Sequence, residues 1–117
     1  MEQKIREQLE EHFPKNLIKQ RDSGFGKFDY LATATVIQRL NDVLKSDWSF
    51  EVVEHIRDEY EIAVLVKLTV GDIIKMQWGS ASIKCKKNST KIISLGDDYK
   101  SATSDALKKA ATLLGCG

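Results

Sequence analysis

Apolar and polar residues alternate over the middle of the chain as they do in half-buried β-strands. The alternation is clearest from Tyr60 to Val70, where every second residue is apolar. Gly71 and Asp72 then separate two apolar runs and predict a tight two-residue hairpin turn, while residues 57–59 predict the preceding turn. We therefore expect three consecutive antiparallel strands, at about residues 48–56, 60–70 and 73–83.

Apolar residues at helical spacing predict two helices before these strands. The first spans about residues 2–12 and ends before a proline. The second spans about residues 35–45, where Thr35 and Gln38 form a capping-box pattern. Between them, the glycines of residues 22–30, DSGFGKFDY, predict a loop, and we expect its three aromatic residues to fold back on the core.

The last helix is predicted from about Asp98 to Leu114, after a Gly96–Asp98 turn that caps it and before Gly115, which suits a left-handed C-terminal position. One half of this helix is expected to pack on the sheet: Tyr99, Ala102, Ala106, Ala110, Leu113 and Leu114. The other half sets two lysines among small residues: Lys100, Ser101, Ser104, Lys108, Ala111 and Thr112. The elements together predict a single α+β domain over residues 1–117, with helix, helix, three-stranded antiparallel sheet and a C-terminal helix packed on the sheet.

Composition agrees with one domain and excludes several classes of protein. The 117 residues are 42% hydrophobic, which supports one modest core and not two. No stretch approaches the roughly 18 apolar residues of a membrane span, and the N-terminus is too charged for a secretory signal, so we expect a cytoplasmic protein. Two cysteines without a CxxC pair and two histidines do not indicate a zinc site.

Charge is unevenly distributed, although the net charge is only +1. Residues 1–83 hold 11 Lys and Arg against 14 Asp and Glu, whereas residues 84–117 hold 7 Lys against 3 Asp, which gives −3 and then +4. This asymmetry predicts a localised basic surface. Part of it is a lysine loop over residues 84–94, which carries Lys84, Lys86, Lys87 and Lys91. Lysines of this kind bind phosphates without recognising the base sequence. A lysine-rich segment that is simply exposed to solvent has the same sequence pattern.

Motifs for covalent chemistry are missing from the sequence. The chain lacks the Walker phosphate loop, the Rossmann glycine motif, the HExxH zinc motif and the serine elbow. Asp97 and Asp98 are interpreted as helix caps, and His12 and His55 as ordinary polar side chains. We therefore expect neither enzymatic activity nor a cofactor.

The segment from Gly96, GDDYKSATSDALKKAATLLG, resembles the signature helix of the Rad52/Rad22 single-strand annealing family. It combines an acidic turn, an Ala/Ser/Thr-rich first half, the DALKK core at residues 105–109 and a closing Leu-Gly. The segment from Tyr30, YLATATVIQRLNDVLKSDWSFEV, is similar to the first conserved stretch of the family. HFPKNLIKQR, from His12, is similar to the N-terminal part of its bacterial and phage branch, which includes DNA damage response protein A and phage annealases.

The resemblance implies a ring-forming homo-oligomer that holds single-stranded DNA in a basic groove. It also implies annealing of complementary strands, without ATP, in homologous recombination and the repair of DNA damage. Lys108 matches the helix lysine that lines the family's inner DNA groove, and Lys109 and Lys100 match other basic positions of the motif. Thr35 stands at the position where eukaryotic members have a DNA-contacting arginine. Arg39, one helical turn later, is the residue that we expect to replace that contact.

By the same resemblance, the lysine loop is assigned to a secondary DNA surface, and a single-strand-binding protein or another recombination factor is an expected partner. Relatives continue beyond the position of Gly117, so we expect a truncated chain or a missing partner-binding tail. Two alternatives stay open. The order helix, three strands, helix is also that of a double-stranded RNA-binding domain, and a pure assembly protein would use its last helix and strand edges for subunit contacts.

Overall fold

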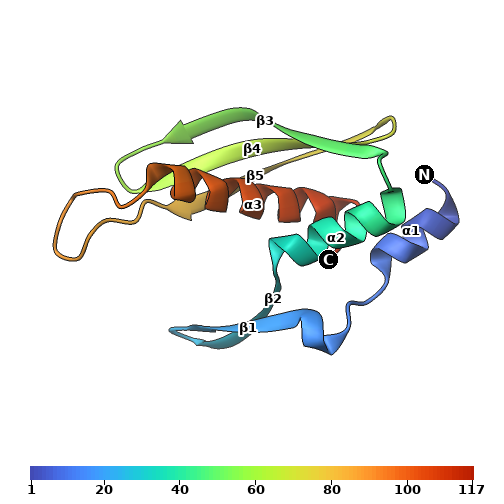
Figure 1. Cartoon of the computed structure of the whole chain (residues 1–117), viewed down its shortest axis with the longest axis horizontal. Coiled ribbons are helices and arrows are strands. Elements are labelled where there is room, and N and C mark those ends of the chain that lie inside the picture. The colour runs from blue at the N-terminus through green and yellow to red at the C-terminus, as the bar shows by residue number, and fades with distance from the viewer.

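Three long strands and one long helix form the centre of the protein in the computed structural model, which describes residues 1–117 except for the side chain of Ser23 (Figure 1). The strands are β3 (Trp48–Arg57), β4 (Glu61–Val70) and β5 (Ile73–Ser82). They pair antiparallel in the order β3-β4-β5. The three predicted strands are thus confirmed, and so is the hairpin turn, in which Gly71 has a φ of +60°.

The helix α3 (Leu95–Leu113) packs on β4 and β5 and covers one face of the sheet (Figure 1). The alternation in β4 turns five of its side chains into the core below α3: Ile62, Val64, Val66, Leu68 and Val70. Burial of each contributes roughly 1.5–3 kcal/mol relative to exposure. Gly79 of β5 lets the helix approach closely, because a β-carbon there would overlap the Ala106 backbone nitrogen and lie 2.6 Å from the Ala102 carbonyl oxygen.

The buried face of α3 is wider than predicted, and it is shifted. Ala111, expected on the open half, is fully buried, whereas Leu113, expected on the sheet, is 49% exposed. The reason is that α2 (Thr33–Leu44) packs against α3 as a second neighbour beside the sheet. The left-handed end is confirmed, since Gly115 has a φ of +95° and its N–H donates to the Thr112 carbonyl oxygen at 2.9 Å.

The start of α3 differs from the prediction. Ser94 is the N-cap, and its hydroxyl accepts a hydrogen bond from the Asp97 N–H at 3.2 Å. Asp98 does not cap the helix; its carboxylate is buried and binds Lys84 instead. The capping box predicted for α2 is also wrong, because Ala32 is the N-cap and Gln38 donates to Asp42.

The N-terminal segment forms α1 (Gln3–Glu10), a short turn η1 (Lys15–Leu17) and a hairpin of β1 (Ile18–Ser23) and β2 (Gly26–Leu31). Helices α1 and α2 contact each other near the C-terminal half of α3 (Figure 1), and each buries a leucine fully in the core, Leu9 from α1 and Leu40 from α2. None of the described helices is both long enough and apolar enough to cross a membrane.

The hairpin corrects the prediction of a loop over residues 22–30. Both faces of this hairpin are largely solvated, so its sequence lacks the apolar alternation that marks a half-buried strand. The expectation that its aromatic residues fold back on the core is wrong for Phe25 and Phe28, which are 103% and 45% exposed, whereas Tyr30 is half-buried. The fold class is therefore α+β with helices, a three-stranded sheet and an additional two-stranded sheet that the prediction lacked.

Candidate nucleic-acid interface

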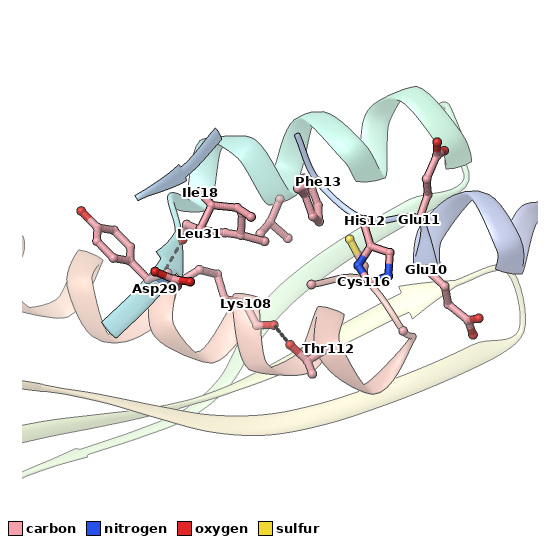
Figure 2. Close-up of a pocket in the computed structure, with 14 residues that line it drawn as sticks. Glu10, Glu11, His12, Phe13, Ile18, Asp29, Leu31, Lys108, Thr112 and Cys116 are labelled. Atoms are coloured by element: carbon pink, nitrogen blue, oxygen red, sulfur yellow. Dashed lines mark hydrogen bonds between the residues drawn. The ribbon is translucent and has the colours of Figure 1, made fainter. Parts of the chain in front are cut away.

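A cavity of about 510 Å³ opens between the C-terminal half of α3, the end of α1 and the β1–β2 hairpin (Figure 2). Lys108 and Thr112 project into this region from α3, His12 and Phe13 come from the segment after α1, and Leu31 comes from the end of β2. Elements that are distant in sequence thus meet around the lysine that the family resemblance singles out.

Lys108 is held in a defined position at this cavity. Its Nζ donates a hydrogen bond to the Leu31 carbonyl oxygen at 3.2 Å and lies 5.9 Å from the centroid of the Tyr30 ring (Figure 2 shows the bond to Leu31). The side chain is half-buried. An ammonium group has three N–H donors, so two remain for a phosphate oxygen after the carbonyl is bound. Lys108 is therefore a pre-positioned cation.

The cavity itself is not an anion site. Glu10, Glu11 and Asp29 line it together with Lys108, which gives three carboxylates for one ammonium group. A phosphate inside would be repelled by the carboxylates at short range. Any phosphate bound by Lys108 would therefore have to lie outside the cavity.

The structure separates the three helix lysines. Lys100 and Lys108 lie about 12 Å apart along the helix axis and about a quarter turn apart around it, so both can follow one strand of nucleic acid. Lys109 lies about half a turn away from Lys100 and forms an ion pair with Asp105, at 3.0 Å between Nζ and Oδ2. The same Asp105 oxygen accepts the Ser80 backbone N–H at 3.0 Å and so ties α3 to the edge strand β5.

The lysine loop lies beyond the N-terminal end of α3, away from the cavity at Lys108 (Figure 1). Lys84 supports the fold, because its backbone N–H and its Nζ bind the buried Asp98 carboxylate at 3.2 and 3.5 Å. The loop continues as a small hairpin, closed by a 2.9 Å hydrogen bond from the Lys86 N–H to the Lys91 carbonyl oxygen. Lys86, Lys87 and Lys91 are exposed, and in the described part of the chain none of them forms an ion pair.

Arg39 closes the C-terminal end of α1. Its Nη1 donates to the carbonyl oxygens of Gln8, Leu9 and Glu11 at 3.3, 3.2 and 2.7 Å. Its guanidinium carbon also lies 3.9 Å from the centroid of the Phe13 ring. A cation that satisfies terminal helix carbonyls in this way is a structural cap. Contact between Arg39 and DNA stays a prediction, and these bonds argue against it.

The two cysteines differ in environment. Cys85 is exposed and Cys116 is buried, and both carry free thiols. Burial raises the pKa of the Cys116 thiol, and the nearby charge of Arg39 opposes that rise in part. Among the described residues, no cluster of three or more His, Cys, Asp or Glu side chains could hold a metal ion.

Sequence reasoning missed Tyr30 as a neighbour of Lys108, because it placed the aromatic segment in a loop. The usable signal was the spacing in KQRDSGFGKFDY, from Lys19 to Tyr30. With Gly24 and Phe25 as a two-residue turn, strand pairing sets the cations of one strand opposite the rings of the other.

Comparison with the curated proteins gives no match. The model of the family described as Rad52/22 family double-strand break repair protein matches residues 1–117, the whole chain, and this protein therefore belongs to that family.

Proposed function

We propose that the protein binds single-stranded DNA over α3 and the adjoining hairpin and promotes annealing of complementary strands, without nucleotide hydrolysis, in recombination and DNA repair. Its membership of a family of double-strand break repair proteins gives the biological setting. The observation that carries the proposal is Lys108, the lysine matched to the family's groove, which stands fixed by the Leu31 carbonyl oxygen with donors to spare.

Binding through lysines suits annealing for a physical reason. Contacts between ammonium groups and phosphates hold the sugar-phosphate chain and release counterions, whereas they leave the base edges open for pairing. Lys100 and Lys108 would hold the strand along α3. The exposed lysine loop, Lys86, Lys87 and Lys91, serves as a second, weaker surface beyond the start of that helix.

Self-association into a ring is part of the proposal, and the uncovered face of the sheet supports it. The strand register places Ile56 of β3 and three residues of β5, Ile74, Met76 and Trp78, on the face opposite α3. These side chains are 57%, 54%, 43% and 38% exposed, in that order. Exposed apolar residues on an uncovered sheet face are typical of a contact between protein subunits, and the Glu51–Lys67 ion pair on the same face adds a charged element to it.

Replacement of Lys108 by Met tests the proposal, because Met keeps most of the aliphatic stem and removes the charge. We expect binding of a labelled single-stranded oligonucleotide to weaken by about tenfold or more, as for loss of a charge-assisted hydrogen bond. The slope of log affinity against log salt should fall by about 1, and annealing of complementary oligonucleotides should slow in parallel.

Lys109→Met is the matched control. It removes the same charge one residue away, from a side chain that Asp105 already neutralises. Equal affinity, salt slope and annealing rate in wild type and Lys108→Met would contradict the proposed site.

A purely structural oligomer is the second candidate, and the uncovered apolar face of the sheet is what favours it. Light scattering with and without oligonucleotide separates the two functions. The structural function would be supported if the mass of the oligomer is the same with and without DNA and if the protein shows no salt-dependent affinity for DNA.

A further inference from the structure

A second cavity, of about 440 Å³, opens where α1, the last turn of α3 and the start of β5 meet (Figure 1 shows these elements). All three elements contribute side chains to its walls: Arg6 and Glu10 from α1, Leu113 from α3, and Ile73 and Lys75 from β5. We call these five residues the basic apolar pocket. Its volume lies within the range of roughly 300–1,000 Å³ that is typical of sites for ligands larger than a single ion.

The fold directs these side chains to one place. Ile73 and Lys75 pair with buried residues of β4, so both project to the side of the sheet on which α3 lies. Arg6 and Glu10 stand four residues apart on α1 and therefore lie on the same side of that helix. The pocket is thus a product of the tertiary fold, and its residues are spread over most of the sequence.

The two cations of the pocket are available for a ligand. Arg6 is exposed and Lys75 is half-buried, and among the described residues neither forms an ion pair. The end of α3 does not need Lys75 as a cap, because the carbonyl oxygens of Ala111 and Thr112 already accept backbone N–H groups at 2.9 to 3.1 Å. Glu10 is a single carboxylate against these two cations. The side chains of the pocket therefore carry a positive net charge.

The other part of the pocket is apolar. Leu113 is 49% exposed and Ile73 is half-buried. One exposed leucine on a protein surface is ordinary, but this one lines a concave site beside two cations. Sites that combine apolar walls with a few charged groups bind ligands that carry both kinds of group.

We propose that the basic apolar pocket binds an acidic segment of a partner protein, in which one or two carboxylates stand next to an aliphatic or aromatic side chain. Arg6 and Lys75 bind the carboxylates through charge-assisted hydrogen bonds. The apolar side chain of the segment covers Leu113 and Ile73. The inference goes beyond the proposed function, because it assigns a protein partner to a site that does not contain Lys108.

Nucleic acid is a competing occupant that the pocket fits less well. A phosphate chain would place regular negative charges beside Glu10, which repels them, and would leave Leu113 uncovered. The pocket also differs from the cavity at Lys108. The two share Glu10, Thr112 and Gly115 as lining residues, but Lys108 lines only the larger one. Charge and apolar surface together thus favour an acidic peptide.

The experiment measures binding of a fluorescein-labelled hexapeptide, DELDLF, to the whole chain by fluorescence anisotropy. We expect saturable binding that weakens by about tenfold in Arg6→Gln and in Lys75→Gln, as for loss of a charge-assisted hydrogen bond. Lys4→Gln is the matched control, because it removes a cation of α1 more than half a turn away from Arg6. Its affinity should stay within about twofold of wild type.

Two further variants test the apolar wall and the carboxylate. Leu113→Ser should weaken DELDLF by about fivefold, because it removes apolar contact area, and should not change the weak binding of DESDSS, which keeps the charges alone. Glu10→Gln should tighten DELDLF by about twofold, because it removes a like charge. Such a gain does not arise from damage to the fold, and circular dichroism melts of each variant verify that the domain is folded.

The outcomes distinguish the possible occupants. Absence of DELDLF binding, or equal affinity in wild type and both cation variants, overturns the proposal. Displacement of the peptide by an oligothymidylate, with weaker oligothymidylate binding in Arg6→Gln and Lys75→Gln, would assign the pocket to nucleic acid instead. A smaller oligomer in Leu113→Ser without peptide binding would assign it to a second copy. None of these results decides the Lys108→Met test, so the proposed function stands or fails separately.

Discussion

The long helix and the β1–β2 hairpin carry cations in two different ways. Helix α3 lies so close to the sheet that its backbone directly contacts Gly79. The lysines of α3 are therefore attached to a helix that is tightly packed on the sheet. The hairpin is held by its own ladder of strand pairs and by the Lys108 hydrogen bond, and most of its side chains are exposed. Packing against the sheet therefore fixes the lysines of the helix in place, whereas the hairpin carries its cations on a largely solvated surface.

The largest expected effect comes from filling the contact between helix and sheet. In Gly79→Val the added side chain meets the Ala106 backbone, which cannot move without shifting the whole helix. We expect the free energy of unfolding to fall by roughly 3 kcal/mol or more, measured by urea denaturation. Gly24→Ala is the control in the hairpin, where a β-carbon meets nothing within 4 Å, and it should change stability by less than about 0.5 kcal/mol. Similar losses in both variants would contradict the contrast between the two regions.

Two arginines over aromatic rings sharpen the comparison. Arg39 lies 3.9 Å from the Phe13 centroid and binds three carbonyl oxygens, whereas Arg21 lies 5.6 Å from the Tyr30 centroid on the open hairpin face. Arg39→Met should lower the free energy of unfolding by about 1–3 kcal/mol and leave the oligonucleotide affinity of the folded protein unchanged.

Arg21→Met should do the reverse, with weaker binding and a change in stability of less than about 0.5 kcal/mol. Chemical denaturation and fluorescence anisotropy on the same two variants supply both readouts. A lower oligonucleotide affinity of folded Arg39→Met would instead support a contact between Arg39 and DNA.

The smallest expected effect lies in the turn between β3 and β4. The backbone N–H groups of Tyr60 and Glu61 donate to the Asp58 carboxylate at 2.7 and 2.8 Å and hold its pKa below the ordinary value of 3.8. Because the folded-state pKa is lowered, the carboxylate stabilises the fold fully above pH 3.8, and this contribution is lost as the pH falls through the lowered value. NMR titration of Asp58 and acid unfolding of Asp58→Asn check it; an Asp58 pKa at or above 3.8 would contradict the turn geometry.

Elements with a buried face were predictable from the sequence, and solvated ones were not. Helix α3 covers one side of β4, and the side chains on that side have to be apolar because they are buried. This burial is visible in the sequence as an apolar residue at every second position. The β1–β2 hairpin is mostly solvated on both faces and left no such mark. The family was predicted and is confirmed by the match over the whole chain, whereas the bacterial and phage branch stays a prediction.

The site was predictable only in part, for a similar reason. Lys108 stands in a local sequence pattern that identifies it, but its bond to the Leu31 carbonyl oxygen joins residues 77 positions apart. The three bonds of Arg39 span 28 to 31 positions. Local periodicity contains no information on such pairings, which depend on how complete elements meet.

The Asp105 bond to Ser80 limits how copies of this chain can join. An incoming strand along β5 would have to compete with a carboxylate for that N–H group, and along β3 it would meet the irregular register at Val52 and Glu54. Each border of the sheet thus has one position that disfavours pairing with an added strand. Any contact between copies would therefore be favoured at the broad faces of the domain over these borders.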